Sequence, residues 1–157
     1  MEKAISVRQP FADFIKRGVK YIETRTKPTN YRGRVVICSS KKPHQGSYFT
    51  VIENRELDIN CINFLEQLKF ATEIKFGYAL CTADLVDCRP MVKADELPAR
   101  CRLYDGAYSW VFENIRKIDP FPVKGQLGIF NLDVDDLALK PIDGEKIDEL
   151  IFGKLLN

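Results

Sequence analysis

The sequence has few of the residues that build metal and disulfide sites. It contains one histidine, His44, and five cysteines, an odd number in which no two have CxxC spacing. A single imidazole and scattered thiols do not supply the four-ligand sets that hold structural zinc. Three of the cysteines lie inside apolar segments, where a reduced, buried thiol is the usual state. We therefore expect no metal centre and no cofactor.

Long apolar runs are also absent. No stretch reaches the roughly 18 residues that a membrane-spanning helix needs. Residues 1–5 lead straight into a strand-like segment and lack the apolar core of a secretory signal. A length of 157 residues without repeats or linker-like tracts fits one domain with a substantial core. We expect a cytoplasmic protein with no membrane contact.

The net charge of +2 is unevenly spread along the chain. Residues 1–42 hold eleven Lys or Arg and three acidic residues, a balance of +8, whereas residues 131–157 hold three Lys and seven acidic residues, a balance of −4. The basic N-terminal third favours an anionic partner such as a nucleic acid or a phosphate. Alternatively, the two ends of the chain pack together and neutralise each other.

The hydrophobic pattern predicts about six strands and two to three helices. Strands are expected at residues 3–7, 21–26, 34–40, 77–88, 108–118 (ended by Pro120 and Pro122) and 127–132. Helices are expected between Pro10 and Gly18, at 55–72, as a short turn at 95–98, and at the C-terminus around 147–155. Because the strands do not alternate regularly with helices, the pattern favours an α+β domain with a small barrel or a strongly curved sheet.

The segment from Gly18 to Arg25 concentrates polar groups in an expected strand. The two-residue period of a strand places Tyr21, Glu23 and Arg25 on one face, and Lys20 stands at the start of that strand. A carboxylate, a guanidinium and a phenol then share one surface with an ammonium at its end. Such a face either carries solvated ion pairs that contribute little energy or lines a polar cleft.

The spacing Gly-x-Lys-x-x-Glu-x-Arg at residues 18–25 resembles the signature of the ASCH domain, named for homology to activating signal cointegrator. Five further segments resemble blocks of that family in the same order: Ser6–Ala12, Tyr31–Gly33 with Ser40–Lys42, Tyr78–Cys88, Tyr108–Asn114 and Lys124–Phe130. Phe11 stands where the family usually has tryptophan. The resemblance covers about residues 4–132, so we divide the chain into a domain at 1–132 and an extension at 133–157, expected to be a helix packed on it.

The resemblance implies a PUA-like fold, a small β-barrel with helices packed round a cleft, and a role linked to RNA or other nucleic acid. In such a cleft Glu23 could accept hydrogen bonds from a base amine. Arg25 could fork onto a phosphate or stack on a base, and Lys20 could act as a point charge towards phosphate. Gln9, at the head of the first helix, could offer its amide to the same ligand.

Aromatic and basic residues outside the motif extend this expected site. Tyr108 and Trp110 share a strand face and either stack on a base or pack in the core. Basic side chains that could follow the phosphate backbone are Arg8, Arg32, Lys41 and Lys42. Lys41 and Lys42 are alternatively an ordinary solvated pair. Because the sequence has no helix-turn-helix, basic zipper or zinc finger, single-stranded RNA or a nucleotide is a better candidate ligand than duplex DNA.

Two other functions remain open. Some small bacterial proteins of the family remove the acetyl group from acetylated cytidine and other relatives cleave RNA, which implies a metal-independent hydrolase. Their motif has threonine where this chain has Glu23, so Lys20 with a lowered pKa would have to act as the base, and Glu23 or Glu113 would move protons. Thr24 is expected on the opposite strand face. The third possibility is a protein-interaction module of a transcription- or RNA-linked complex.

Overall fold

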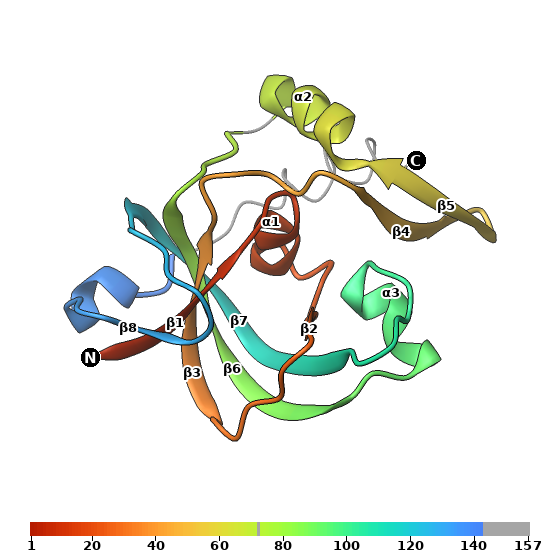
Figure 1. Cartoon of the computed structure of the whole chain (residues 1–157). Coiled ribbons are helices and arrows are strands. Elements are labelled where there is room, and N and C mark those ends of the chain that lie inside the picture. Colours follow the sequence, from red (N-terminus) through yellow and green to blue (C-terminus); the bar gives the residue numbers. More distant parts are fainter. Residues whose placement is uncertain (72, 143–157) are drawn as a thin grey trace.

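A computed structural model of the chain describes residues 1–71 and 73–142, which form a mixed α+β domain on one six-stranded sheet (Figure 1). The strands are β1 (Glu2–Val7), β2 (Ile22–Arg25), β3 (Gly33–Ser39), β4 (Ser47–Ile52), β5 (Arg55–Asn60), β6 (Tyr78–Pro90), β7 (Tyr108–Pro122) and β8 (Phe130–Leu132). The helices are α1 (Phe11–Lys16), α2 (Cys61–Ala71) and α3 (Glu96–Ala99), with 3₁₀ turns η1 (Lys93–Asp95) and η2 (Asp136–Leu139).

The sheet runs in the order β2-β7-β6-β3-β1-β8, and β4 pairs with β5 in a separate hairpin. Strand β1 runs parallel to β3, and the other neighbours are antiparallel. Within the described residues the edge strands β2 and β8 do not pair with each other, so the sheet is open. The α+β class predicted from the sequence is confirmed, whereas a closed barrel is not.

Irregular pairing bends the two longest strands. The register between β6 and β7 shifts at three places, and such bulges increase the local twist and curvature of a sheet. The prediction that the strand ends before Pro120 was wrong, because β7 continues through Pro120 and ends at Pro122. Pro120 falls within one of the register shifts and Pro122 at the strand end, where a missing backbone N–H breaks no ladder.

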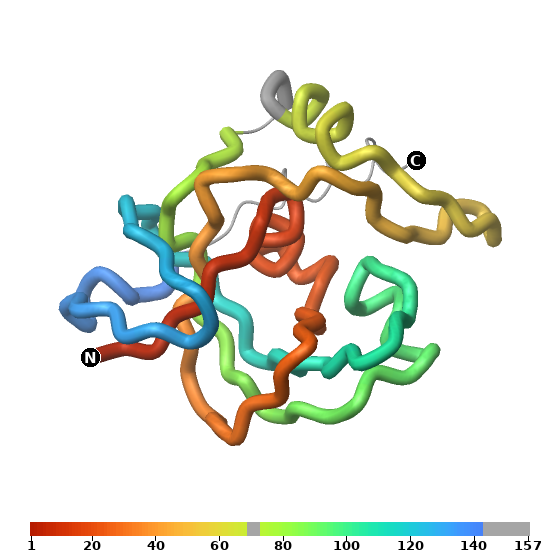
Figure 2. Tube along the Cα trace, viewed as in Figure 1, coloured from red at the N-terminus to blue at the C-terminus, as the bar shows by residue number. Residues whose placement is uncertain are grey.

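Helix α1 fills the concave side of the curved sheet, where it packs against β1, β3, β6 and β7 (Figures 1 and 2). Its buried residues include Phe14 and Ile15, which the helical spacing had placed on one face. Gly18 follows the helix with a φ of +79°, a left-handed conformation that suits glycine, so the expected cap is confirmed. The helix thereby turns the chain directly into the loop that carries Lys20.

The predicted helix at 55–72 was wrong in its first six residues. Residues 55–60 form β5, which pairs with β4 through a two-residue turn in which Glu53 and Asn54 have φ values of +50° and +65°. Leu57 fits both a helical and an alternating pattern, and periodicity alone cannot separate these. The helix begins at Cys61, after Asn60 accepts a hydrogen bond from the backbone N–H of Asn63 at 3.0 Å, as a capping residue does.

The remaining predictions agree within a few residues, except that β8 covers only Phe130–Leu132 and residues 124–128 belong to a loop. The described part of the C-terminal extension packs on the domain, since Leu139 is buried in a cluster with Val36 and Ile118. The helix expected around 147–155 lies outside the described residues. Among the helices that the structure describes, none is long and apolar enough to cross a membrane.

Candidate functional site

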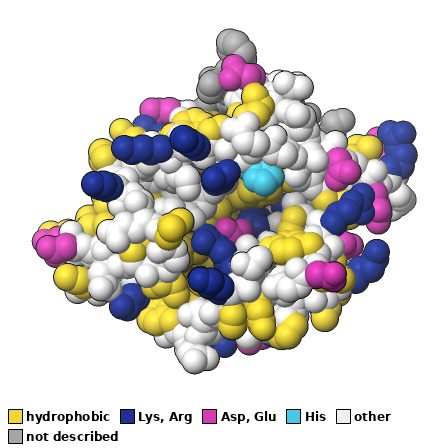
Figure 3. Space-filling view, in the orientation of Figure 1, with side chains coloured by type: hydrophobic (Ala, Val, Ile, Leu, Met, Phe, Trp, Pro, Cys, Tyr) yellow, Lys and Arg dark blue, Asp and Glu magenta, His cyan; other side chains and the backbone are white. Residues whose placement is uncertain are grey.

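A cavity of about 920 Å³ lies on the side of the domain seen in Figure 3, where Lys and Arg side chains gather around a central hollow. This volume is typical of small-molecule sites. The lining comes from the ends of β1 and β3, from the start of α1, from β2, and from the segments before β2, β4 and β6. The residues around the end of α3 and the β7–β8 loop complete it. The cavity is therefore assembled from segments distant in sequence.

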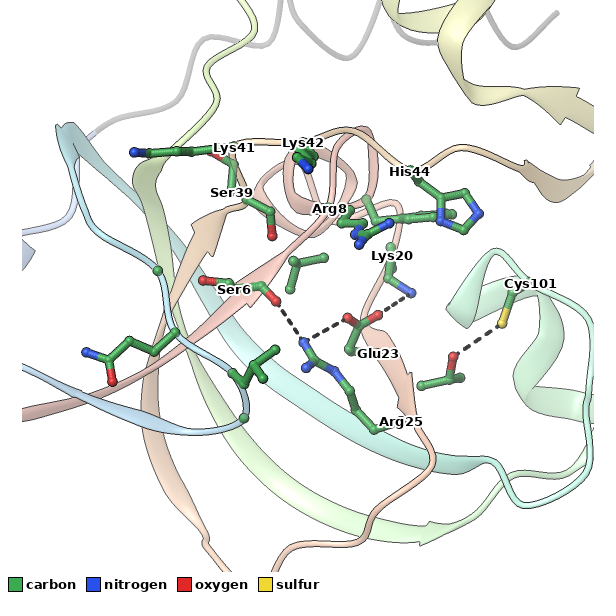
Figure 4. A pocket seen from close by; sticks show the side chains of 18 of the residues that line it. Ser6, Arg8, Lys20, Glu23, Arg25, Ser39, Lys41, Lys42, His44 and Cys101 are labelled. Atoms are coloured by element: carbon green, nitrogen blue, oxygen red, sulfur yellow. Dashed lines mark hydrogen bonds and ion pairs between the residues drawn. The ribbon is translucent and has the colours of Figure 1, made fainter.

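Glu23 occupies the centre of this cavity and holds two cations (Figure 4). Its Oε1 lies 3.3 Å from Lys20 Nζ, and its Oε2 lies 3.2 Å from Arg25 Nη2. The side chains of Lys20, Glu23 and Arg25 are 2%, 13% and 26% exposed, so they are sheltered but open to the cavity. The structure brings together the three charged groups of the sequence motif.

Lys20 is fully committed to partners within the protein. Its Nζ donates hydrogen bonds of 2.6 Å to the carbonyls of Ile22 and Ala99, in addition to its ion pair with Glu23. Three acceptors match the three N–H groups of an ammonium, whereas a neutral amine with two N–H groups would leave one acceptor unpaired. The geometry is that of a positively charged anchor, with no donor left for a phosphate.

The charge state of Glu23 follows from two opposing influences. Burial is the strongest single one and raises the pKa of the carboxyl. The nearby charges of Lys20 and Arg25, with hydrogen bonds from Lys20 and from the backbone of Thr24, together outweigh it, so that the pKa lies below its ordinary value. Glu23 is therefore a carboxylate at neutral pH, and each oxygen keeps lone-pair capacity for a further donor.

Arg25 connects the motif to the opposite side of the cavity and keeps donors free. Its Nη2 donates to the Ser6 carbonyl at 2.9 Å and to Glu23 Oε2 at 3.2 Å. Among the described residues, its Nε and Nη1 groups have no hydrogen-bond partner, which leaves three N–H groups for a ligand. The guanidinium carbon also lies 5.7 Å from the ring centre of Trp110, within cation–π range.

Four further cations line the cavity without any carboxylate beside them. These are Arg8, Lys41, Lys42 and Lys124, and none of them forms an ion pair within the part of the chain that the structure describes. Together with Lys20 and Arg25 they make six cationic side chains against the single carboxylate of Glu23, a formal balance of +5 for the lining. A concave surface with this excess of one charge concentrates anions.

His44 lines the same cavity, whereas its residue type alone had suggested only a metal ligand. Burial lowers the pKa of its imidazole most, the charges of Arg8 and Lys20 lower it further, and Glu23 opposes them. The ring packs edge-on against Phe11 with centroids 5.1 Å apart. At neutral pH this side chain is an uncharged imidazole that can both donate and accept. The sequence feature that could have indicated His44 as a site residue is its position directly after Lys41-Lys42-Pro43.

The expectation that Gln9 faces the ligand is corrected by the structure. Gln9 is completely buried, and its amide nitrogen donates to Asp13 Oδ1 at 2.7 Å and to the Lys75 carbonyl at 2.9 Å. Its carbonyl oxygen accepts from the backbone N–H of Asp13 at 2.9 Å. Gln9 thus caps the first turn of α1 and links it to the residues before β6, and it does not line the cavity.

The aromatic pair and Arg32 also lie outside the cavity lining. Trp110 is 4% exposed and belongs to the main core cluster, and Tyr108 packs against that cluster. The core-packing alternative therefore holds for both residues. The Trp110 indole N–H donates to the Lys27 carbonyl at 3.1 Å. Arg32 donates to the carbonyls of Thr29 and Tyr31 at 2.9 Å each, which holds the turn before β3.

Both faces of β2 contribute to the cavity, which alternation alone did not predict. Thr24 was expected to point away, yet it lines the cavity together with Glu23 and Arg25. Its hydroxyl oxygen lies 3.6 Å from Cys101 Sγ (Figure 4). Because β2 is an edge strand with one unpaired side, the cavity can extend round it. Tyr21, expected beside Glu23, is 45% exposed and outside the lining.

All three motif residues lie within residues 5–122, the range matched by the family model described as the ASCH domain. The chain belongs to the ASCH domain family. This ASCH chain is 26% identical over 132 residues to activating signal cointegrator 1 of Homo sapiens, and 25% identical over 131 residues to the same protein of Mus musculus. Each alignment covers 82% of the chain but only 22% of the relative, so the chain spans about a fifth of those proteins.

One solved structure aligns with nearly the whole ASCH chain. The crystal structure of a mutant of the ZmASCH protein from Zymomonas mobilis superposes with a TM-score of 0.49 at 13% identity, covering 98% of this chain and 97% of that one. In residues 1–71 and 73–142 no group of three His, Cys, Asp or Glu side chains is placed to hold a metal ion.

Proposed function

We propose that this ASCH domain binds single-stranded RNA or a nucleotide in the cavity around Glu23. The observation that carries the proposal is the lining itself, with six cations against one carboxylate. The ASCH family is generally linked to RNA binding, which agrees with a site of this charge. Arg8, Lys41 and Lys42 belong to the group without ion-pair partners in the described residues, and they contact phosphates.

The motif residues have different tasks in this proposal. Glu23 accepts hydrogen bonds from a base amine or a sugar hydroxyl, because its oxygens keep free lone pairs. Arg25 donates to the ligand through Nε and Nη1, which the protein leaves unused. Lys20 positions Glu23 and does not touch the ligand, since its three donors are already occupied.

A single strand fits this cavity better than a duplex. Proteins that read duplex DNA place a helix or a β-ribbon in the major groove. Helix α1, which contributes Phe11 to the cavity, is six residues long and packs against four strands, so it cannot enter a groove. An unpaired base, in contrast, can leave its neighbours and enter a pocket while the flanking phosphates stay at the rim.

Salt-dependent binding tests the proposal. The affinity of a fluorescent eight-nucleotide single-stranded RNA would be measured by anisotropy at several salt concentrations. Each phosphate contact adds about 0.7 to the slope of log K against log salt, so Lys42→Gln should lower both the affinity and the slope by one contact. Lys93→Gln is the matched control, because Lys93 is 81% exposed and outside the cavity. Equal effects of the two substitutions would reject the cavity as the RNA site.

The hydrolase alternative has less support from the geometry. A lysine acting as a base must give up a proton and offer a lone pair, whereas Lys20 Nζ faces three acceptors. Glu113, the other residue considered for proton transfer, is exposed and outside the cavity lining. We expect no product when the protein is incubated with acetylated cytidine under chelator, and a measurable release of acetate would restore this alternative.

A further inference from the structure

The charges that line the cavity divide it into two unlike ends. One end, formed by the residues after β3 and by the β7–β8 loop, carries Lys41, Lys42 and Lys124. At the other end the lining is Thr24, Ser47, Ala99, Cys101 and Tyr104, none of which is charged. Figure 4 shows Lys41 and Lys42 on one side of Glu23 and Cys101 on the other. Glu23 and Arg25 stand between the two ends.

The uncharged end offers groups that suit a planar heterocycle. The Thr24 hydroxyl and the Cys101 thiol form one long contact of 3.6 Å with each other, a weak pairing that a better partner can replace. Tyr104, 40% exposed, supplies an aromatic face after α3. A phosphate moved to this end would leave Lys41, Lys42 and Lys124 behind. The ammonium of Lys20, which contacts the Ala99 carbonyl there, has no donor left to replace the water that the phosphate loses.

We infer that the cavity binds a nucleotide in one polarity, with its phosphate at the cationic end and its base at the uncharged end against Thr24, Cys101 and Tyr104. Glu23 then lies between the two and accepts a hydrogen bond from the sugar or from the base edge. This inference rests on the proposed function, because it assigns the orientation of the ligand within the same cavity. It adds a base subsite in which Cys101 and Tyr104 come from outside the motif segment.

The chain contains its own chemical reporter for this subsite. Cys38, Cys61 and Cys81 are buried, and only Cys88 and Cys101 are partly exposed. Cys101 lines the cavity, whereas Cys88 lies outside the lining and accepts a hydrogen bond from the Thr29 backbone at 3.4 Å. Alkylation by iodoacetamide, followed peptide by peptide with mass spectrometry, therefore compares a thiol at the proposed subsite with an internal control in the same molecule.

Three probes separate the base from the phosphate: uridine 5′-monophosphate, ribose 5-phosphate and an eight-residue oligouridine. We expect the mononucleotide and the oligouridine, at saturation, to slow alkylation of Cys101 at least about 5-fold and to leave Cys88 unchanged, because a base packed on Cys101 excludes the reagent. Ribose 5-phosphate should bind without protecting Cys101.

The outcomes distinguish the inference from the proposed function. Suppose that the oligouridine binds, that Lys42→Gln weakens this binding, and that Cys101 is alkylated as fast as in the absence of ligand. The proposed orientation is then wrong, whereas binding in the cavity is supported. Equal protection by ribose 5-phosphate would also overturn the orientation. If no probe binds at all, both the inference and the proposed function fail.

A substitution provides a second, independent measurement. Thr24→Val keeps the β-branched shape and removes only the hydroxyl, so the strand should be preserved. We expect it to weaken binding of uridine 5′-monophosphate about 2- to 10-fold, the effect of one neutral hydrogen bond, without changing the affinity for ribose 5-phosphate. Lys42→Gln, in contrast, should weaken both ligands. A Thr24→Val protein that binds both ligands as the wild type does would contradict the subsite.

Discussion

The Arg25 guanidinium in β2 donates a hydrogen bond to the backbone carbonyl of Ser6 in β1 at 2.9 Å. These two strands are separated in the sheet by β7, β6 and β3, and no backbone ladder joins them. A side chain thus spans the cavity where the curved sheet stays open. The same guanidinium holds Glu23, so the ligand site and the contact across the open side of the sheet depend on one residue.

Replacing Arg25 by lysine should loosen this connection. Arg25→Lys keeps the charge but lacks the planar fork that reaches Ser6 and Glu23 together, so we expect a loss of about 1 kcal/mol in the free energy of unfolding. Urea denaturation measures the change, and RNA affinity should fall as well. Arg55→Lys, at an exposed position in β5 outside the cavity lining, is the matched control. A stability equal to that of the wild type would show that the contact with Ser6 contributes nothing.

The pair formed by Lys20 and Glu23 should be strongly coupled in a double-mutant cycle. Glu23→Gln leaves a buried ammonium with two carbonyls and no anion, and we expect it to cost about 1.5–3 kcal/mol. Lys20→Met leaves the carboxylate and the two carbonyls without their donor and should cost a similar amount. The double substitution should lower the free energy of unfolding by clearly less than the sum of the two single losses. Losses that simply add would argue against a direct interaction between Lys20 and Glu23.

Acid should destabilise the protein through Glu23. Because the pKa of this carboxyl is lowered on folding from 4.5, the unfolded chain binds the proton first as the pH falls. The ionised Glu23 carboxylate contributes its full stabilisation when the pH is above the unfolded pKa of 4.5. That stabilisation is lost as the pH falls through the lower pKa of the folded protein. Unfolding midpoints in urea between pH 7 and pH 3 should therefore fall less steeply for Glu23→Gln than for the wild type. Parallel curves would contradict a lowered pKa.

His44 should produce a separate effect at milder pH. Burial, with the charges of Arg8 and Lys20, lowers the pKa of its imidazole from 6.5, whereas Glu23 acts in the opposite direction. Above the unfolded pKa of 6.5 the ring is neutral in both states and does not oppose folding. As the pH falls below 6.5, the unfolded chain binds the proton first, so the stability of the folded protein declines. Between pH 7 and pH 5.5 we expect His44→Gln to lose less stability than the wild type, by under about 1 kcal/mol. Thermal melts at both pH values measure this difference.

Local patterns predicted most of the framework. The helical spacing of Phe14 and Ile15 and the glycine at position 18 define α1, and alternation locates β2 with Glu23 and Arg25 on one face. The prediction was wrong where one residue fits two periods, as Leu57 does in the hairpin formed by β4 and β5. It was also wrong at Pro120, because a register shift between β6 and β7 accommodates a residue without an N–H group.

The candidate site was only partly accessible to sequence reasoning. The motif indicated which charged residues act together, but Gln9 is buried by contacts with Asp13 and with Lys75, which lies 66 positions away. Trp110 and Tyr108 pack in the core because α1 and the strands β1, β3 and β6 bring buried side chains to the same cluster. Thr24 lines the cavity because β2 is an edge strand with one unpaired side, and Lys124 reaches the lining from the loop between β7 and β8.

The sequence alone determined the family, the α+β class and the grouping of Lys20, Glu23 and Arg25, because these depend on residue type and short spacing. Only the tertiary structure decided which of these groups remain available to a ligand. The last free N–H group of Lys20 is taken by the carbonyl of Ala99, 79 positions along the chain. The guanidinium of Arg25 is held by the carbonyl of Ser6. The number of hydrogen bonds that a polar group can still make with a ligand depends on all the partners packed around it. Folding brings those partners from distant parts of the chain.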